Sequence, residues 1–266
     1  MTIALATAWN PRGEFSRFET LHPRLLEEYV GMAISLPPEV DPQLAKKMNA
    51  LPRVDTVVTE HWSHGRYMAL KLVEEIGATH VQYADFDRLL RWVETYPDEW
   101  KYVLKQAQEV DCLILGRSPD AYQTHPKALV ETEAISNLVV SSLLGRTMDI
   151  SAGSKCFSKH ACRTILANSV PGNALGTDAE WPIIMKHSDF TVNYLEVDGL
   201  EWESADRYQD KAADRYSQET AATIYDADPE NWSRRVAIAM EIVKVGFDTI
   251  NSKLTAKPAT GNRGDC

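Results

Sequence analysis

Residues 79–87 read Thr-His-Val-Gln-Tyr-Ala-Asp-Phe-Asp, a short apolar run that ends in two acids one residue apart. Its length and apolar character are typical of a buried strand, which Asp85 and Asp87 close. In an extended chain, residues two apart point the same way, so we expect both carboxylates to face one point. Two negative charges at such a short distance repel each other unless a cation lies between them or one carboxylate takes a proton.

The acidic pair predicts a site for a hard divalent cation. Mg²⁺ and Mn²⁺ prefer oxygen ligands and commonly bridge protein carboxylates to the phosphates of a substrate. Of the two acids, Asp87 is the better candidate ligand and Asp85 its helper. For an isolated pair of this kind, a solvated turn with two acids is the usual alternative, so the surrounding sequence has to decide.

The surrounding sequence alternates between strand and helix patterns, which predicts an α/β fold with a mostly parallel sheet flanked by helices. We expect strands at residues 2–8, 30–36, 54–59, 79–84, 111–115 and 190–197. We expect helices at 18–29, 64–76, 89–110 (one or two), 126–144, 159–167 and 232–254, the last forming a C-terminal helix. Residues 149–155 read as a polar loop, and the tail from 254 reads as frayed. Open parallel sheets bind ligands beyond the carboxyl ends of their strands, where both acids fall.

Composition limits the classes of function. The 266 residues are 44% apolar, enough for a sizeable core, and the net charge is −10. That charge argues against a nucleic-acid-binding protein that relies on an overall positive field, but it permits a local basic pocket for phosphates. No apolar stretch is long enough to span a bilayer, which leaves contact with a membrane surface open.

Cysteine usage and the N-terminal residues indicate a cytoplasmic protein. The cysteines are Cys112, Cys156, Cys162 and Cys266, and no pair has zinc-site spacing. Reduced thiols are the simplest interpretation. The chain begins with a strand pattern rather than a basic segment followed by a long apolar one, so we expect no signal peptide.

Three stretches, taken in order, resemble the GT-A class of nucleotide-sugar glycosyltransferases, especially the inverting branch that includes polyprenyl-phosphate sugar transferases. The first is 65–87, where a glycine, a short helix, a second glycine and an apolar strand lead to the acidic pair. The second is 149–158, similar to the family's D-x-x-S-G stretch. The third is 177–181, Thr-Asp-Ala-Glu-Trp, placed where the family carries an acidic base motif. The turn at 7–11 and the absence of a Q-x-x-R-W motif depart from the family pattern.

The resemblance implies roles for several residues. Asp178, with Glu180 as the fallback, is the implied general base, although Asp178 could equally open a helix as an N-cap. Asp85 is implied to face the nucleotide ribose or the water shell of the metal. At the start of a helix, Arg66 could contact a phosphate, or it could be an exposed cap residue. Thr7 and Trp9 lie at the end of the first strand, and we expect them to line the nucleotide pocket, although Trp9 could instead be packed in the core.

The sequence therefore predicts a metal-dependent glycosyltransferase that uses Mg²⁺ or Mn²⁺. It would move a sugar from a nucleoside-diphosphate sugar to an unidentified hydroxyl acceptor, with inversion. Residues 1–210 form the expected catalytic domain, and 211–266 a helical extension with a tail. The alternatives are a catalytically impaired nucleotide-binding or scaffold protein of the same fold and a sugar nucleotidyltransferase. The sugar, base, acceptor and oligomeric state are left open.

Overall fold

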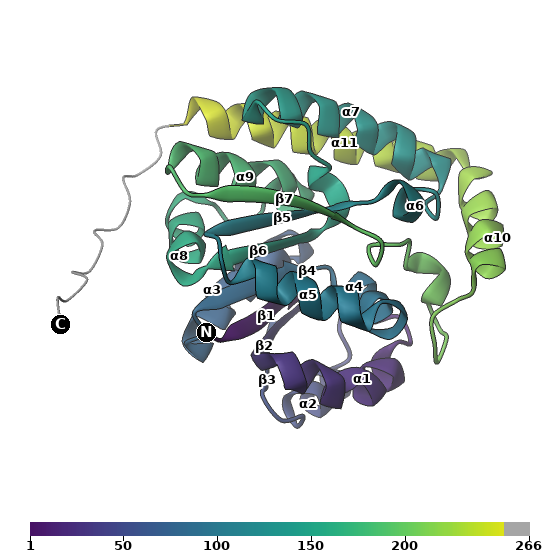
Figure 1. The fold of residues 1–266 in the computed structure, drawn as a ribbon. Coiled ribbons are helices and arrows are strands. Elements are labelled where there is room, and N and C mark those ends of the chain that lie inside the picture. The colour runs from purple at the N-terminus through teal and green to yellow at the C-terminus, as the bar shows by residue number, and fades with distance from the viewer. Residues whose placement is uncertain (253–266) are drawn as a thin grey trace, which may run out of the picture.

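A central sheet with helices on both faces organises the molecule (Figure 1). The computed structural model describes residues 1–252, which contain a seven-stranded sheet in the order β3-β2-β1-β4-β6-β5-β7. The strands are β1 (Ile3–Ala8), β2 (Tyr29–Leu36), β3 (Val54–Val58), β4 (His80–Ala84), β5 (Cys112–Arg117), β6 (Ser154–Ser158) and β7 (Val192–Val197). β6 runs antiparallel to β4 and β5, and the other neighbours are parallel. The predicted α/β class with a mostly parallel sheet is confirmed.

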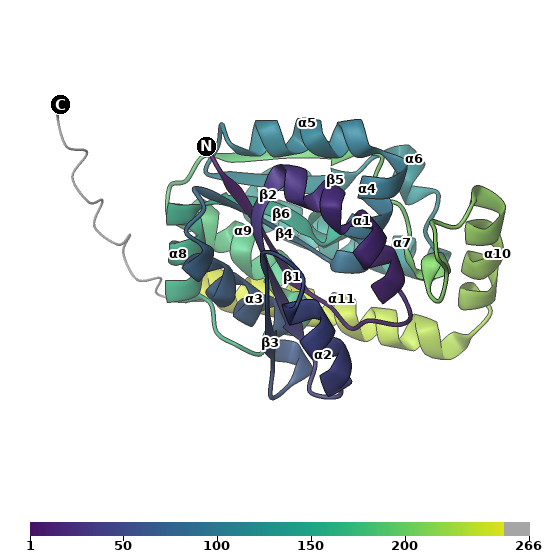
Figure 2. The same cartoon turned by 90° about the horizontal axis from the view of Figure 1, so that it is seen from below.

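The helices fall into two layers, as the view from below also shows (Figure 2). They are α1 (Phe15–Glu28), α2 (Pro42–Asn49), α3 (Gly65–Val73), α4 (Phe86–Thr95), α5 (Pro97–Ala107), α6 (Pro119–Tyr122), α7 (Lys127–Leu144), α8 (Lys159–Asn168), α9 (Thr177–His187), α10 (Arg215–Asp226) and α11 (Pro229–Asn251). Short 3-10 helices are η1 (Trp62–His64), η2 (Glu74–Ile76), η3 (Ile150–Ala152), η4 (Ala174–Gly176) and η5 (Ser204–Asp206).

Alternating side chains of the strands supply two separate cores. On β1, Ile3 and Leu5 pack with residues of α1, α2, α4 and α5. Ala4 and Ala6, which point the opposite way, belong to the core formed with α3, α7, α8, α9 and α11. Burial on both faces explains why the parallel strands read as continuous apolar runs.

β6 is the strand that the sequence analysis missed. Residues 149–155 were expected to be a loop, but Ser154–Ser158 pairs with β4 on one side and β5 on the other. Its polar side chains hid the pattern because their partners come from elsewhere in the chain. The buried amine of Lys155 pairs with Asp178 at 2.7 Å, and Gln82 donates to the Ser154 hydroxyl at 3.2 Å.

Residues after the expected boundary at 210 pack against elements that precede it, and the division itself stays a prediction. α11 lies along α7, and its Ile242 is buried in the same core as residues of α9. α2 and α10 were not expected from the sequence, and the expected frayed tail lies outside the described residues. Within residues 1–252, no helix combines the length and apolar character needed to cross a membrane.

Candidate functional site

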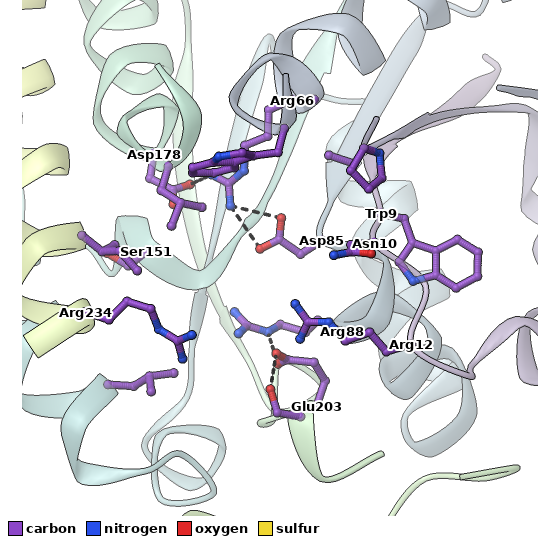
Figure 3. Close-up of a pocket in the computed structure, with 18 of the residues that line it drawn as sticks. Trp9, Asn10, Arg12, Arg66, Asp85, Arg88, Ser151, Asp178, Glu203 and Arg234 are labelled. Carbon is purple, nitrogen blue, oxygen red and sulfur yellow. Dashed lines mark hydrogen bonds and ion pairs between the residues drawn. The ribbon is translucent and has the colours of Figure 1, made fainter. Parts of the chain in front are cut away.

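A cleft of about 690 Å³ opens where β1, β2, β3 and β4 end, between those strands and α7 and α11 (Figure 3). The charged and aromatic residues that line it are Trp9, Arg12, Glu39, Trp62, Arg66, Asp85, Arg88, Glu133, Asp178, Trp202, Glu203, Arg207, Tyr225, Arg234 and Arg235. A smaller cavity of about 240 Å³ shares part of this lining and adds Asp87. The carboxyl ends of the strands therefore converge on the cleft, as an open parallel sheet requires.

Asp85 is held at the centre of the cleft by three neighbours. It stands between the end of β4 and the start of α4, and its backbone N–H donates to the Gly153 carbonyl at 3.0 Å. Nη2 of Arg66 lies 3.1 Å from both carboxylate oxygens, and the Tyr83 hydroxyl donates to Oδ1 at 3.0 Å. These contacts fix the carboxylate in one orientation.

Asp87 lies beside Asp85, but not for the reason expected. The chain turns into α4 directly after Asp85, so Asp87 occupies the first helical turn rather than an extended position. Burial, with the nearby charges of Glu203 and Asp85, raises the pKa of Asp87 to about 7. Such a carboxylate gains from a positively charged ligand, which favours its ionised form.

The acids at this point fit a cation that is shared with a ligand. Within residues 1–252, no three His, Cys, Asp or Glu side chains are grouped to hold a metal by themselves. Mg²⁺ and similar ions commonly bind through one or two carboxylates and take their remaining ligands from water and substrate phosphates. Asp87, whose Oδ1 accepts one backbone hydrogen bond from Arg88, and Asp85 are the residues that would hold such an ion.

Arg66 joins Asp85 to Asp178. Its Nη1 lies 3.0 Å from Oδ1 of Asp178, and Nζ of Lys155 lies 2.7 Å from the same oxygen. Burial opposes ionisation of Asp178, but Arg66 and Lys155 outweigh it and lower the pKa of the carboxyl group. Of the two predicted base candidates, Asp178 is the one that lines the cleft.

Glu180 is placed away from both cavities. Asn173 donates to its Oε1 at 2.7 Å, and the Ser169 hydroxyl donates to Oε2. Burial raises the pKa of Glu180 despite these two hydrogen bonds. The short spacing between Asp178 and Glu180 on α9 turns them to different surroundings, because residues two apart on a helix lie roughly 200° apart.

Thr7 and Trp9, both predicted to line the nucleotide pocket, are held mainly by contacts within the protein. Thr7 is fully buried, and its hydroxyl donates to the Ala84 carbonyl at 2.6 Å, so it ties β1 to β4 and lines neither cavity. Trp9 borders the cleft, but its ring packs edge-on against Phe86 with centroids 4.7 Å apart. Trp62 lines both cavities and is 55% exposed, with the ring of His61 beside it at 5.9 Å between centroids.

The structure thus brings Trp9, Arg66, Asp85, Asp87 and Asp178 around one cleft and leaves Thr7 and Glu180 outside its lining. Sequence reasoning missed further arginines, which are Arg12, Arg88, Arg207, Arg234 and Arg235. They come from the β1–α1 loop, α4, the segment after η5, and α11. No sequence motif links these segments, so their convergence had no signal along the chain.

Comparison with known proteins finds distant structural likenesses. No family model and no curated protein matches the chain. Among solved structures, it is similar to glucosyl-3-phosphoglycerate synthase from Mycobacterium tuberculosis in complex with Mn²⁺, UDP-glucose and phosphoglyceric acid, at 12% identity and a TM-score of 0.42. A structure of that synthase with phosphoglyceric acid has 12% identity and a TM-score of 0.44. Each match covers 89% of this chain and 80% of the other. At this level of similarity we base no functional inference on either protein and argue from the cleft alone.

Proposed function

We propose that this protein is a metal-dependent glycosyltransferase that moves a sugar from a nucleoside-diphosphate sugar to a hydroxyl acceptor. The observation that carries the proposal is the pair Asp85 and Asp87. Asp85 pairs with Arg66 in the cleft of about 690 Å³ at the end of β4, and Asp87, in the first turn of α4, lines the smaller cavity that shares this lining. Small-molecule sites typically have volumes of roughly 300–1,000 Å³. An acidic pair with a guanidinium beside it suits a diphosphate bound together with a divalent cation.

The reaction joins the acceptor oxygen to the anomeric carbon of the sugar. The bond between that carbon and the diphosphate oxygen breaks, the diphosphate leaves with the electron pair, and the acceptor hydroxyl loses its proton. Asp87 and Asp85 would hold a divalent cation, which would supply positive charge where the leaving diphosphate gains negative charge. Arg66, already aimed at Asp85, can donate to the same phosphate oxygens.

Inversion by Asp178 as general base is the finer part of the proposal. Asp178 lines the cleft, but its ion pairs with Arg66 and Lys155 lower its pKa and make it a weak proton acceptor. A bound diphosphate competes for Arg66, and loss of that partner raises the proton affinity of the carboxylate. Binding of the donor would thus raise the pKa of Asp178 and let it accept a proton from the acceptor hydroxyl.

The nucleoside is proposed to lie over the ends of β1, β2 and β3. Ser35, Pro37 and Thr59 line that part of the cleft, and the exposed ring of Trp62 stands at its rim. An aromatic face of this kind can stack on a base. The packed ring of Trp9 leaves that role to Trp62.

One observation favours a second candidate, a nucleotide-binding protein of this fold without turnover. Both predicted base candidates already have protein partners, Asp178 two cations and Glu180 two hydrogen-bond donors. Mn²⁺-dependent hydrolysis or transfer of a bound donor separates the two candidates, since a binding protein releases the donor unchanged.

A thermal-shift panel tests the proposal. UDP-, GDP- and dTDP-sugars are added with and without Mn²⁺. At about 100 times Kd, a ligand specific for the native state adds ~2.7 kcal/mol, which raises the Tm by roughly 5–10 °C. We expect this shift for at least one donor, only with Mn²⁺. Asp87→Ala should remove it.

Asp98→Ala is the matched control, because Asp98 also lies in the first turn of a helix but is exposed outside the cleft. It should leave the Mn²⁺-dependent shift intact. If Asp87→Ala keeps the wild-type shift, the metal–diphosphate site is refuted.

A further inference from the structure

The arginines of the cleft divide into two sets by their partners. Arg66 is matched by Asp85 and Asp178, and Arg88 by Glu203 at 2.9 Å. Arg235 pairs with Glu133. These guanidinium groups have their charge balanced within the protein, so each has a structural reason to be there.

The second set is Arg12, Arg207 and Arg234, none of which makes an ion pair within the described residues. The Arg234 guanidinium donates only to neutral atoms, the Tyr225 hydroxyl and Oδ1 of Asn231, both at 3.1 Å. Nε of Arg207 is buried without a hydrogen-bond partner. This set has donors to spare for a ligand.

Chain connectivity brings the three together from distant segments. The Tyr208 N–H donates to the Arg12 carbonyl at 3.2 Å, which ties the segment after η5 to the β1–α1 loop. Arg234 reaches the same cleft from α11. Figure 3 shows Arg12 and Arg234 on the side of Asp85 opposite to Arg66. Solvated surface arginines are the simpler explanation for any one of them, but convergence on one cavity calls for a shared ligand.

Charge balance indicates which ligand. The charge of a donor diphosphate is balanced by the divalent cation that binds with it. Glu203 is paired with Arg88 and lies within electrostatic reach of Arg207, but it cannot also neutralise Arg12 and Arg234. A second anionic group would give Arg12, Arg207 and Arg234 a partner, and planar guanidinium groups bind phosphate and carboxylate well.

We propose that Arg12, Arg207 and Arg234 form an anion subsite that selects an acceptor bearing a phosphate or carboxylate group besides its reacting hydroxyl. The identification of the ligand as an acceptor rests on the proposed transferase function. The subsite itself rests only on the three unpaired guanidinium groups and the cleft they share.

Calorimetric titration without metal or nucleotide tests the subsite by itself. The probes are glycerol 3-phosphate, glycerate and glycerol, which share a hydroxyl-bearing skeleton and differ in charge. We expect one or both anions to bind at least about tenfold more tightly than glycerol, because charged hydrogen bonds are strong. The anion that binds identifies the acceptor group as phosphate or carboxylate. Equal binding of all three probes overturns the proposal.

Variants locate the binding. Arg12→Gln, Arg207→Gln and Arg234→Gln should each weaken anion affinity by about tenfold, the loss expected for one charged hydrogen-bond donor. Arg215→Gln is the control, since Arg215 on α10 is exposed and pairs with Glu219 outside the cleft. Anion affinity unchanged in all three cleft variants overturns the proposal.

Measuring donor binding distinguishes failure of the anion subsite from failure of the proposed transferase. Mn²⁺-dependent binding of the nucleotide sugar should persist in Arg234→Gln. If the arginine variants lose donor affinity and not anion affinity, the arginines serve the donor diphosphate and the subsite is refuted. If the wild type binds anions through the arginines but binds no nucleotide sugar, the transferase is refuted and the anion subsite stands.

Discussion

Asp178 shows how one buried carboxylate can serve both structure and chemistry. It is 4% exposed and pairs with Arg66 and with Lys155, whose buried amine has no other counter-ion among residues 1–252. A buried charge that loses its partner is costly. The same carboxylate faces the cleft, so its protonation state depends on what else Arg66 contacts.

Asp178→Asn should lower kcat by about 100- to 10,000-fold, the usual contribution of a general base, while donor affinity changes far less. Steady-state kinetics and donor titration measure the two effects, and circular dichroism checks that the variant is folded. Glu180→Gln is the matched control, the same kind of change two residues along α9 but outside the cleft. Normal turnover in Asp178→Asn with loss in Glu180→Gln would exchange the two roles, and normal turnover in both would favour the non-catalytic candidate.

At the scale of elements, the turn between η3 and β6 sets the position of the acidic pair. Gly153 adopts φ +71°, and its carbonyl accepts the backbone N–H of Asp85. A Cβ at this position would lie 2.3 Å from Oδ2 of Asp85. Glycine is therefore needed twice, for its backbone conformation and for the close approach of the carboxylate.

Gly153→Ala should displace Asp85 and remove the Mn²⁺-dependent binding of a nucleotide sugar. Gly77→Ala is the control, since Gly77 has a similar φ of +78° but no atom within 4 Å of the added Cβ. In both variants, backbone strain should lower the free energy of unfolding by roughly 1–2 kcal/mol. Thermal shift with and without donor separates strain from displacement, and equal donor binding in both variants would contradict this role for the turn.

At the scale of the whole molecule, Glu133 holds the C-terminal helix against the sheet. From α7 it pairs with Arg117 of β5 at 2.6 Å and with Arg235 of α11. Arg117 also pairs with Asp149, just before η3, at 2.8 Å. This buried network connects the sheet, α7 and α11, and Arg235 of α11 also lines the cleft.

Glu133→Gln should lower the free energy of unfolding by about 3–5 kcal/mol, because both arginines lose a buried counter-ion. Glu131→Gln, an exposed change on the same helix, should stay within about 0.5 kcal/mol. Urea denaturation measures both values. A Glu133→Gln protein as stable as Glu131→Gln would show that α11 is held by apolar packing alone.

The sequence by itself determined the strand–helix alternation and the place of Asp85 and Asp87 at a strand end, because both depend on local patterns of apolar and acidic residues. The extended geometry that the sequence predicted for the two acids was wrong, because α4 begins at Phe86, between Asp85 and Asp87. The local pattern could not reveal β6, because its buried Lys155 depends on an ion pair with Asp178, which comes from α9.

Tertiary structure alone decided which side chains share the cleft. Side-chain direction on α9 separated Asp178 from Glu180, and a hydrogen bond to Ala84 took Thr7 out of the lining. The chain brought Arg12 and Arg234 together across more than two hundred residues of sequence. Sequence patterns report nearest neighbours along the chain, whereas charge pairing and cavity lining depend on contacts that exist only once the sheet and its two helical layers have assembled.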